Sequence, residues 1–280
     1  MDERNILLAY RTIKRNKGSI TPGTNENNII SLAESKPELL IRYVRKRLMD
    51  YKPEPVKRVE IPKLGGTGTR PLGIPCIEDR LIQQCIKQVL EPICEAKFYN
   101  HSYGFRPNRS AHHAISRMTS LANKSHLHYV VDIDIKGFFD NVNHGKLLKQ
   151  MWAMGIQDKC LLSIVSKMLK AEIKGIGIPN KGTPQGGILS PLLSNIVLNE
   201  LDWWISNQWE TFETKHSYIR NNRNYDDHSG KYRALRTTKL KEMYIVRYAD
   251  DFKLMCRSYE TAQKAFIAVK DWLKCRLGLD

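Results

Sequence analysis

The chain has 280 residues, of which 41% are hydrophobic and 26% charged, so one large domain or two closely associated ones can bury a core. Its 45 Lys and Arg against 29 Asp and Glu give a net charge of +16 and a pI near 9.6, which favours a polyanionic partner. Because no apolar run approaches the roughly 18 residues that span a bilayer, nucleic acid is a better candidate than a membrane.

Two helices are predicted near the N-terminus, over residues 3–16 and 37–50, with a polar loop at 18–28 between them. In the second helix Ile41, Val44 and Leu48 form an apolar stripe, and most of the remaining surface is basic. A basic face of this kind has two interpretations, a solvated surface and an RNA-binding one. The candidate RNA contacts of this region are Lys14, Arg15, Lys17, Arg42, Arg45 and Lys46.

A strand–turn–strand unit is predicted at residues 56–74, with a glycine-rich turn at 64–69. No GK[ST] follows this turn, which excludes a P-loop, and no dinucleotide-binding fingerprint is present. Helical periodicity resumes over residues 77–98. The segment Tyr103-Gly104-Phe105-Arg106-Pro107 interrupts it, and a further helix is expected at about 110–122.

The second half of the chain begins with a predicted buried strand over residues 128–135, which runs into Lys136-Gly137-Phe138-Phe139-Asp140. Helices are expected at 144–153 and 158–170, and a glycine-rich stretch at 182–187 opens a long apolar helix at about 190–204. Residues 211–241 are expected to form an irregular polar insertion with many basic side chains. We expect three of these, Lys231, Arg233 and Arg236, to contact RNA backbone.

An acidic motif, Tyr248-Ala249-Asp250-Asp251, lies between the apolar runs 243–246 and 252–256. Two strands joined by a tight turn would place both carboxylates at the tip of a hairpin. Adjacent acids repel each other unless a cation neutralises them, so the motif indicates a divalent metal ion. Asp226-Asp227 is a contrasting pair, because it lies in a polar loop without a predicted strand on either side. A final helix is expected at about 259–277.

This order of elements predicts an α+β fold with an antiparallel sheet. It places Asp134 at the end of one strand and Asp250 and Asp251 at the tip of a potential neighbour, so three carboxylates would converge. Nucleotidyl transfer uses two Mg²⁺ ions about 4 Å apart, held by carboxylates and completed by phosphates and water. Acidic strand ends in a basic protein therefore suit a polymerase site.

The six cysteines show no C-x-x-C spacing and mostly lie inside apolar segments. They are interpreted as buried thiols of a reducing cytosol and not as a zinc site or a disulfide frame. The expected location is the cytoplasm, in a bacterial cytosol.

Six sequence blocks together resemble the group II intron-encoded reverse transcriptases, also called maturases. The blocks are Ile61-Pro62-Lys63 with residues 70–75; Asp79-Arg80 with Gln83; residues 103–107; residues 134–140; residues 182–195; and Tyr248-Ala249-Asp250-Asp251-Phe252. Each block alone is weak, whereas six in the correct order with plausible spacing are specific.

The resemblance implies a right-hand polymerase with fingers at 1–128, including the basic N-terminal extension, and a palm at 129–280. The palm would contain a helical excursion at about 148–181 and the basic insertion at about 211–241. In this family the metal-binding Asp precedes an aromatic residue by five positions, and only Asp134, five residues before Phe139, fits that pattern. Asp132 and Asp140 lead to Gly137 and Gly145 instead.

The same resemblance assigns the site residues. Asp134, Asp250 and Asp251 would be catalytic and, with Ile135, would hold two Mg²⁺ ions, for which Mn²⁺ is a substitute. Phe139 resembles the steric gate that excludes a ribose 2′-hydroxyl and so selects dNTPs, although a core aromatic is the alternative. Lys63 and Arg70 resemble the residues that grip the triphosphate, and Gln185 and Gly186 resemble those that line the nucleotide and template pocket.

The resemblance implies an RNA-directed DNA polymerase, a nucleotidyltransferase that also binds its intron RNA to assist splicing and mobility. Its partners would be the intron RNA, an RNA template with a DNA primer, and dNTPs. The alternative is an RNA-binding splicing cofactor with a vestigial polymerase site. Relatives continue into a thumb and a DNA-binding or endonuclease region, so we expect this chain to be the fingers and palm of a longer protein. A homodimer, formed through apolar surface that a thumb would cover, is a further expectation.

Overall fold

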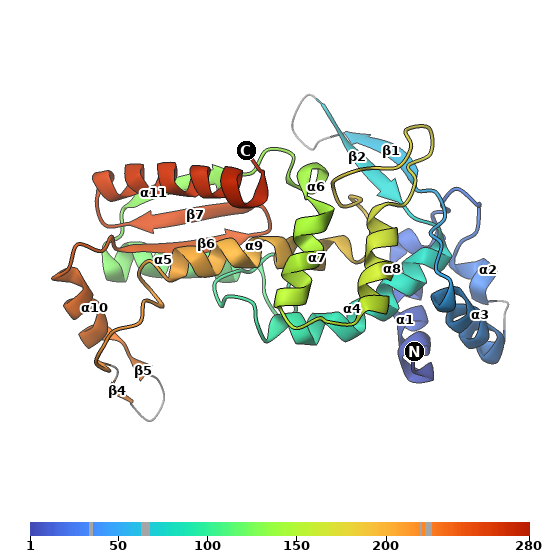
Figure 1. Cartoon of the computed structure of the whole chain (residues 1–280), viewed down its shortest axis with the longest axis horizontal. Helices are drawn as coiled ribbons and strands as arrows, with labels where there is room; N and C mark the ends of the chain where they lie inside the picture. Colours follow the sequence, from blue (N-terminus) through green and yellow to red (C-terminus); the bar gives the residue numbers. More distant parts are fainter. Residues whose placement is uncertain (34–35, 63–67, 219, 222–225) are drawn as a thin grey trace. The chain divides into compact units, whose positions relative to one another are not determined.

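The computed structural model describes residues 1–33, 36–62, 68–218, 220–221 and 226–280 (Figure 1). The chain forms two compact units that alternate along the sequence. Unit 1 comprises Met1–Lys97 and Gly137–Val197, and unit 2 comprises Phe98–Lys136 and Leu198–Asp280. These boundaries differ from the predicted division after residue 128, because the chain passes from one unit to the other three times. The assignment of fingers and palm remains a prediction.

Unit 1 is mostly helical. Its strands β1 (Lys57–Pro62) and β2 (Thr69–Ile74) form an antiparallel pair in which Ile61 lies opposite Arg70. Its helices are α1 (Glu3–Lys14), α2 (Ile29–Ala33), α3 (Pro37–Met49), α4 (Ile77–Glu95), α6 (Phe138–Asn141), α7 (His144–Ala153), α8 (Lys159–Leu169) and the first part of α9 (Ser190–Ser206), with a 3₁₀ turn at Lys17–Ile20.

The helix ends in unit 1 follow from local sequence. The Asp158 carboxylate accepts a hydrogen bond from the amide of Cys160 at 2.8 Å, which satisfies an otherwise unpaired donor at the start of α8. Asn143 caps α7 in the same way, through the amide of Lys146. The buried stripe of α1 contains Ile6, Ala9 and Ile13, and α1 packs against α4.

Unit 2 is built on a three-stranded antiparallel sheet with the order β3-β7-β6. The strands are β3 (Tyr129–Asp134), β6 (Met243–Tyr248) and β7 (Asp251–Cys256), and a two-residue pair, β4 (Arg220–Asn221) and β5 (Asp226–Asp227), lies apart from them. The helices are α5 (Ala111–Ser125), the second part of α9, α10 (Ser229–Arg236) and α11 (Tyr259–Trp272), which continues into a π-helical turn at Leu273–Leu277.

The two faces of this sheet are covered differently. Tyr244, Val246 and Met255 share one face by the strand register, and they pack in a buried cluster with Ala114 and Leu121 of α5. Toward the other end of the same face, Tyr248, Asp251 and Asp134 are exposed. The packed end of the face therefore holds the strands in register, and the open end presents carboxylates.

Two predictions about the second half of the chain are wrong. β3 is not a buried strand: it forms the edge of the sheet, and Tyr129 and Val130 are 44% and 48% exposed. The segment 211–241 is not irregular throughout, because it contains β4, β5 and α10. Asp226-Asp227 accordingly lies in a short strand and not in a loop.

The structure shows the state of the cysteine thiols and the lengths of the apolar helices. All six cysteines are described and all carry free thiols, but Cys160 and Cys275 are exposed, contrary to the expectation of burial. Within the described residues, no helix is both long enough and apolar enough to cross a bilayer.

Candidate active site

The register of β3 on β7 places Asp134 directly opposite Asp251, so the two carboxylates share one face of the sheet. The same register pairs Tyr248 of β6 with Asp251. Asp250 lies in the turn between β6 and β7 and is partly exposed. These strand ends lie where the apolar runs of the sequence predicted them. Like charges at directly opposite positions repel, which makes this edge of the sheet favourable for a cation.

The predicted convergence of three carboxylates is only partly seen. Asp134 and Asp251 are brought together as strand partners, whereas no group of three or more His, Cys, Asp or Glu side chains among the described residues is arranged to hold a metal ion. Mg²⁺ is commonly bound through one or two carboxylates plus substrate phosphates and water. Two exposed carboxylates on one face fit that donor set, and their roles as ligands stay a prediction.

A lysine that the sequence reasoning overlooked provides the positive charge. Lys253 Nζ lies 2.9 Å from Asp251 Oδ1 and 2.6 Å from Asp132 Oδ1. Burial lowers the pKa of Lys253, but its hydrogen bonds to Asp132 and Asp251 outweigh that effect and raise it. The two-residue period of a strand predicts this contact, because Lys253 follows Asp251 by two positions and so shares its face. Asp132 is thus paired with a lysine.

A buried ion pair holds the backbone of the acidic turn, residues 249–250 between β6 and β7, in place. Arg247, 1% exposed, donates from Nε and Nη2 to the two carboxylate oxygens of Asp202 in α9, at 2.8 and 2.7 Å. Its Nη1 donates to the carbonyl of Ala249 at 2.7 Å. Ala249 has φ of +59°, a left-handed conformation that is uncommon outside glycine. Arg247 therefore links the α9 core to the backbone immediately before Asp250.

Gly104 permits the chain to approach this turn closely. A Cβ added at Gly104 would lie 2.2 Å from the amide nitrogen of Ala249, so no side chain fits there. Next to Gly104, Tyr103 donates its amide to the carbonyl of Arg247 at 2.9 Å. The segment 103–107, predicted only as an interruption between helices, therefore packs against the acidic turn and bonds to its backbone.

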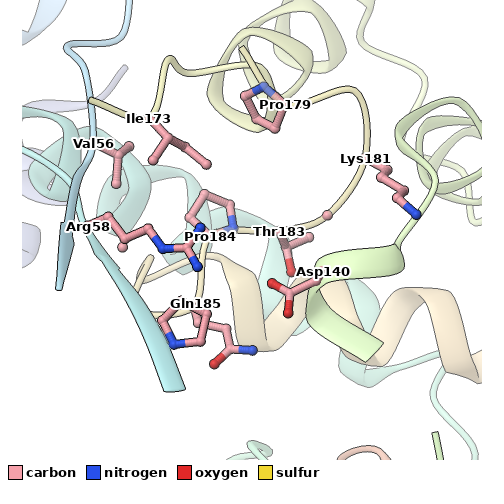
Figure 2. Close-up of a pocket in the computed structure, with 12 residues that line it drawn as sticks. Val56, Arg58, Asp140, Ile173, Pro179, Lys181, Thr183, Pro184 and Gln185 are labelled. Atoms are coloured by element: carbon pink, nitrogen blue, oxygen red, sulfur yellow. The ribbon is translucent and has the colours of Figure 1, made fainter. Parts of the chain in front are cut away.

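Unit 1 contains a cavity of about 100 Å³ that is lined by one of the predicted nucleotide residues, Gln185 (Figure 2). Gln185 and Thr183 line it, together with Arg58 and Asp140. Thr183 is 3% exposed, and its hydroxyl has no hydrogen-bond partner within the part of the chain that the structure describes. A buried, unpaired hydroxyl in a cavity lined by charged side chains of both signs is a suitable contact for a polar ligand group.

The backbone around this cavity shows why small residues are needed. Gly186 has φ of +108°, and a Cβ there would lie 2.6 Å from the carbonyl oxygen of Gly73 in β2. The expectation that a small residue allows close backbone approach is therefore consistent with the geometry. His144 donates from Nε2 to the carbonyl of Gly182 at 2.7 Å and fixes the start of the segment. Burial lowers the pKa of His144, which keeps its ring neutral.

The other predicted nucleotide and metal residues are placed as follows. Arg70 lies exposed on β2, and Lys63 lies outside the described residues. Phe139 is partly buried and packs edge-to-face on the buried Phe138, with ring centroids 5.4 Å apart. The side chain of Ile135 is 2% exposed.

The predicted RNA contacts divide into two groups. The exposed ones are Lys14, Arg15, Lys17, Arg42, Arg45, Lys46, Arg233 and Arg236. Lys231 differs from the expected exposed contact, because it is only 8% exposed and its Nζ donates to the carbonyl of Glu210 at 3.0 Å. Arg236 forms an ion pair with Glu242, in which Nη2 lies 2.8 Å from Oε1. Charge counting missed both because it does not register internal partners.

The family described as reverse transcriptase (RNA-dependent DNA polymerase) matches residues 61–279. The protein YkfC of Escherichia coli K12 is 34% identical over 98% of this chain and 75% of its own length. The group II intron-encoded protein LtrA of Lactococcus lactis is 38% identical over 71% of this chain, and the match spans only 33% of LtrA.

Solved structures agree on the fold. Telomerase from Candida albicans, solved in complex with a fragment of telomeric RNA, superposes with a TM-score of 0.53 at 12% identity. The match covers 87% of this chain and 44% of that one. At this identity the likeness shows the fold alone, a right-hand polymerase fold of the α+β class. The chain belongs to the reverse transcriptase family of RNA-directed DNA polymerases.

Proposed function

We propose that this chain extends a DNA primer on an RNA template, with Asp134, Asp250 and Asp251 holding two Mg²⁺ ions. The observation that carries the proposal is the pairing of Asp134 with Asp251 on the open end of the sheet, beside the turn that holds Asp250. When bound, the metal ions lower the pKa of the attacking 3′-hydroxyl and neutralise the leaving phosphates. Mn²⁺, which also accepts oxygen ligands, would substitute.

The protein's own contribution is to hold these carboxylates ready. Arg247 fixes the carbonyl of Ala249, and Lys253 offsets the charge of Asp251 before metal arrives. The exposure of Asp251, whose side chain is 59% accessible, leaves oxygen lone pairs available to an ion. The turn that Arg247 holds needs little rearrangement when the substrate binds, whereas a metal ion has to displace Lys253 from Asp251.

We further propose that Lys63, Arg70, Phe139, Gln185 and Gly186 contact the incoming dNTP or the template. The cavity beside Gln185, with the unpaired hydroxyl of Thr183, supports a polar ligand in unit 1. Phe139 is partly exposed, as a gate against a ribose 2′-hydroxyl requires. Its replacement by Ala should raise the incorporation of rNTPs relative to dNTPs.

We propose an RNA partner on the evidence of the chain's net charge and of the names of its relatives. The net charge of +16 suits a nucleic acid, and the relative LtrA is named as encoded by a group II intron. Intron RNA is thus the natural candidate, besides the template. We also propose a bacterial cytosolic location and a homodimer.

Primer extension tests the function. The protein is supplied with an RNA template, a DNA primer, dNTPs and Mg²⁺, and Asp250→Asn is compared with wild type. Loss of one metal-holding carboxylate should cost at least about 3 kcal/mol in the barrier, a decrease of about 100-fold or more. Unchanged extension in Asp250→Asn would refute the catalytic assignment.

A further inference from the structure

A second concave surface of unit 1 has no role in the proposed chemistry. It is a groove of about 660 Å³ between residues 51–53, α7 and α8. Four lysines line it, namely Lys52, Lys159, Lys167 and Lys170, and no Asp or Glu is among the described residues of its lining. The volume lies within the roughly 300–1,000 Å³ of ligand-binding clefts. A cavity lined by four cations selects an anionic occupant.

The nearest carboxylate neutralises only part of this charge. Asp50 lies 2.9 Å from Lys52 Nζ and 3.9 Å from Lys167 Nζ, and its side chain is 68% exposed. Such exposed pairs are weak and easily exchanged for a phosphate. For Lys159 and Lys170, both exposed, no ion pair with a carboxylate occurs among the residues that the structure describes. These two lysines are the free charges of the groove.

The cations are arranged in a row and not at a point. Lys159, Ser163 and Lys167 lie at positions 0, 4 and 8 of α8, and Lys170 caps its C-terminus at position 11, so the four follow one helix face. From Lys159 to Lys170 this face extends about 16 Å. A linear array of positive charge of that length matches successive phosphates along one strand, whereas a single phosphate would use only one end.

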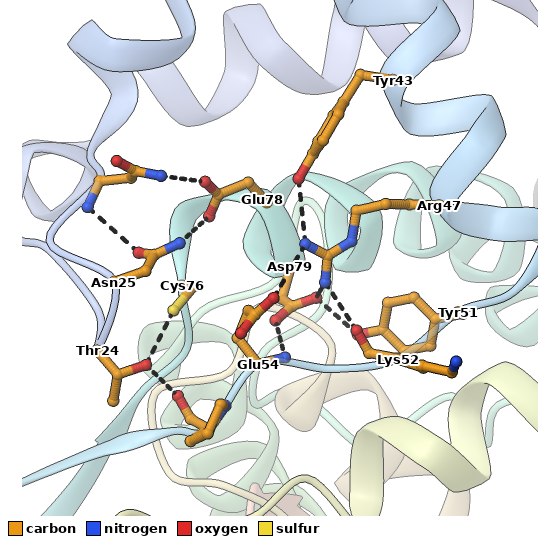
Figure 3. Close-up of polar contacts among 12 residues, drawn as sticks. Thr24, Asn25, Tyr43, Arg47, Tyr51, Lys52, Glu54, Cys76, Glu78 and Asp79 are labelled. Carbon is orange, nitrogen blue, oxygen red and sulfur yellow. Dashed lines mark hydrogen bonds and ion pairs between the residues drawn. The ribbon is translucent and has the colours of Figure 1, made fainter.

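The segment of residues 51–53 that lines the groove is held by a polar network around the buried Asp79 (Figure 3). Arg47 donates to the carbonyl of Lys52 at 2.8 Å and to Asp79 Oδ1 at 3.0 Å. Asp79 also accepts from the hydroxyl of Tyr51 at 3.1 Å and from the amide of Glu54 at 2.8 Å. The segment that carries Lys52 is therefore fixed before any ligand binds, which reduces the entropic cost of binding.

The floor of the groove is apolar. Pro53, Leu148 and Leu162 contribute to it, and each is only partly buried. A duplex presents phosphates but keeps its bases stacked inside, so it would leave this surface in water. An unpaired nucleotide covers such a surface with its base while its phosphates reach the lysines.

We propose that the α8 groove binds single-stranded RNA, with Lys159 and Lys170 on its phosphates and a base against Leu148 and Leu162. The inference rests on the proposed RNA-binding function and assigns it a surface that the N-terminal basic residues do not form. It requires neither dNTPs nor a metal ion. Equilibrium binding therefore tests it independently of polymerase activity.

The experiment measures the affinity of an unstructured 12-nucleotide RNA by fluorescence anisotropy from about 50 to 200 mM salt. Lys159→Gln/Lys170→Gln should lower the slope of log K against log salt by about 1.4, because each single-strand phosphate contact contributes about 0.7. A matched control, Lys270→Gln/Lys274→Gln, removes the same charge from exposed lysines of unit 2 and should leave the slope nearly unchanged. Asp50→Asn should tighten binding, since it frees Lys52 and Lys167.

Three outcomes would overturn the proposal. An equal loss in the groove variant and in the control would show a general charge effect. An equal loss for a duplex of the same sequence would exclude the base contact. Equal affinity for a poly-glutamate peptide would identify a generic polyanion surface. Thermal melts of both variants verify folding. If wild-type primer extension fails while the predicted slope change is observed, the polymerase proposal falls and the groove assignment stands.

Discussion

The ion pair between Arg247 and Asp202 gives the sharpest test of how the acidic turn is supported. Both side chains are almost fully buried, and two hydrogen bonds of 2.8 and 2.7 Å join them. Replacing Asp202 by Leu leaves a guanidinium in the core without its counter-ion, which should cost about 3–5 kcal/mol of unfolding free energy. Arg247→Met, which strands the carboxylate, should cost a similar amount.

The double variant Asp202→Leu/Arg247→Met should recover most of that loss, because a buried ion pair contributes little more than apolar residues of similar volume. It still lacks the donor to the carbonyl of Ala249, a further cost of about 1 kcal/mol. We expect it to lie within about 2 kcal/mol of wild type. The sum of the two single-variant losses in unfolding free energy should exceed the loss in the double variant by several kcal/mol. That difference is the coupling energy of the pair.

Urea unfolding followed by tryptophan fluorescence measures this cycle. Four of the five tryptophans, Trp203, Trp204, Trp209 and Trp272, lie in unit 2, where both mutated residues are located. Additive single losses would show that the two side chains do not depend on each other. A cost below about 1 kcal/mol for Asp202→Leu would show that Arg247 is not desolvated. Either result would refute the reasoning.

Three further predictions concern single residues. Burial lowers the pKa of His144 below its ordinary 6.5, so its contribution to stability is full above pH 6.5 and is lost as the pH falls through the lowered value. The advantage in unfolding free energy of wild type over His144→Gln should therefore shrink between about pH 7.5 and 5, and a constant difference would contradict a role in holding Gly182. Gly104→Ala forces a Cβ into the backbone of Ala249 and should destabilise unit 2 by at least about 2 kcal/mol, whereas an unchanged urea midpoint would show that the two segments separate freely. Lys253→Met removes a positive charge beside two carboxylates and should tighten Mn²⁺ binding measured by electron paramagnetic resonance, while weaker binding would show that the lysine organises the site instead of competing with the ion.

The acidic site was predictable because local signals agree with one another. Apolar runs on both sides of Asp250-Asp251 predict a hairpin, and the family spacing selects Asp134 over its neighbours. Strand pairing then leaves few choices, since a register shift of one residue would turn the apolar side chains of β7 to the opposite face. The observed partnership of Asp134 with Asp251 follows from these constraints.

The features that were missed depend on partners distant in sequence. Tyr129-Val130-Val131 is a continuous apolar run typical of a buried strand, yet only tertiary packing decides that β3 is an edge. The helix α10 contains Tyr232 and Leu235 among basic residues, so its apolar stripe is hidden by charge. The burial of Lys231 similarly depends on a carbonyl 21 positions earlier.

The central claim is that Asp134 is a metal-holding carboxylate and Asp132 is not. Both residues lie on β3 and share one exposed face, so Asp134→Asn and Asp132→Asn are closely matched changes. The deciding measurement is the single-turnover rate of dNTP addition to a DNA primer on an RNA template. We predict a loss of at least about 100-fold for Asp134→Asn and less than about 10-fold for Asp132→Asn. Equal rates for the two variants, or the greater loss in Asp132→Asn, would contradict the account.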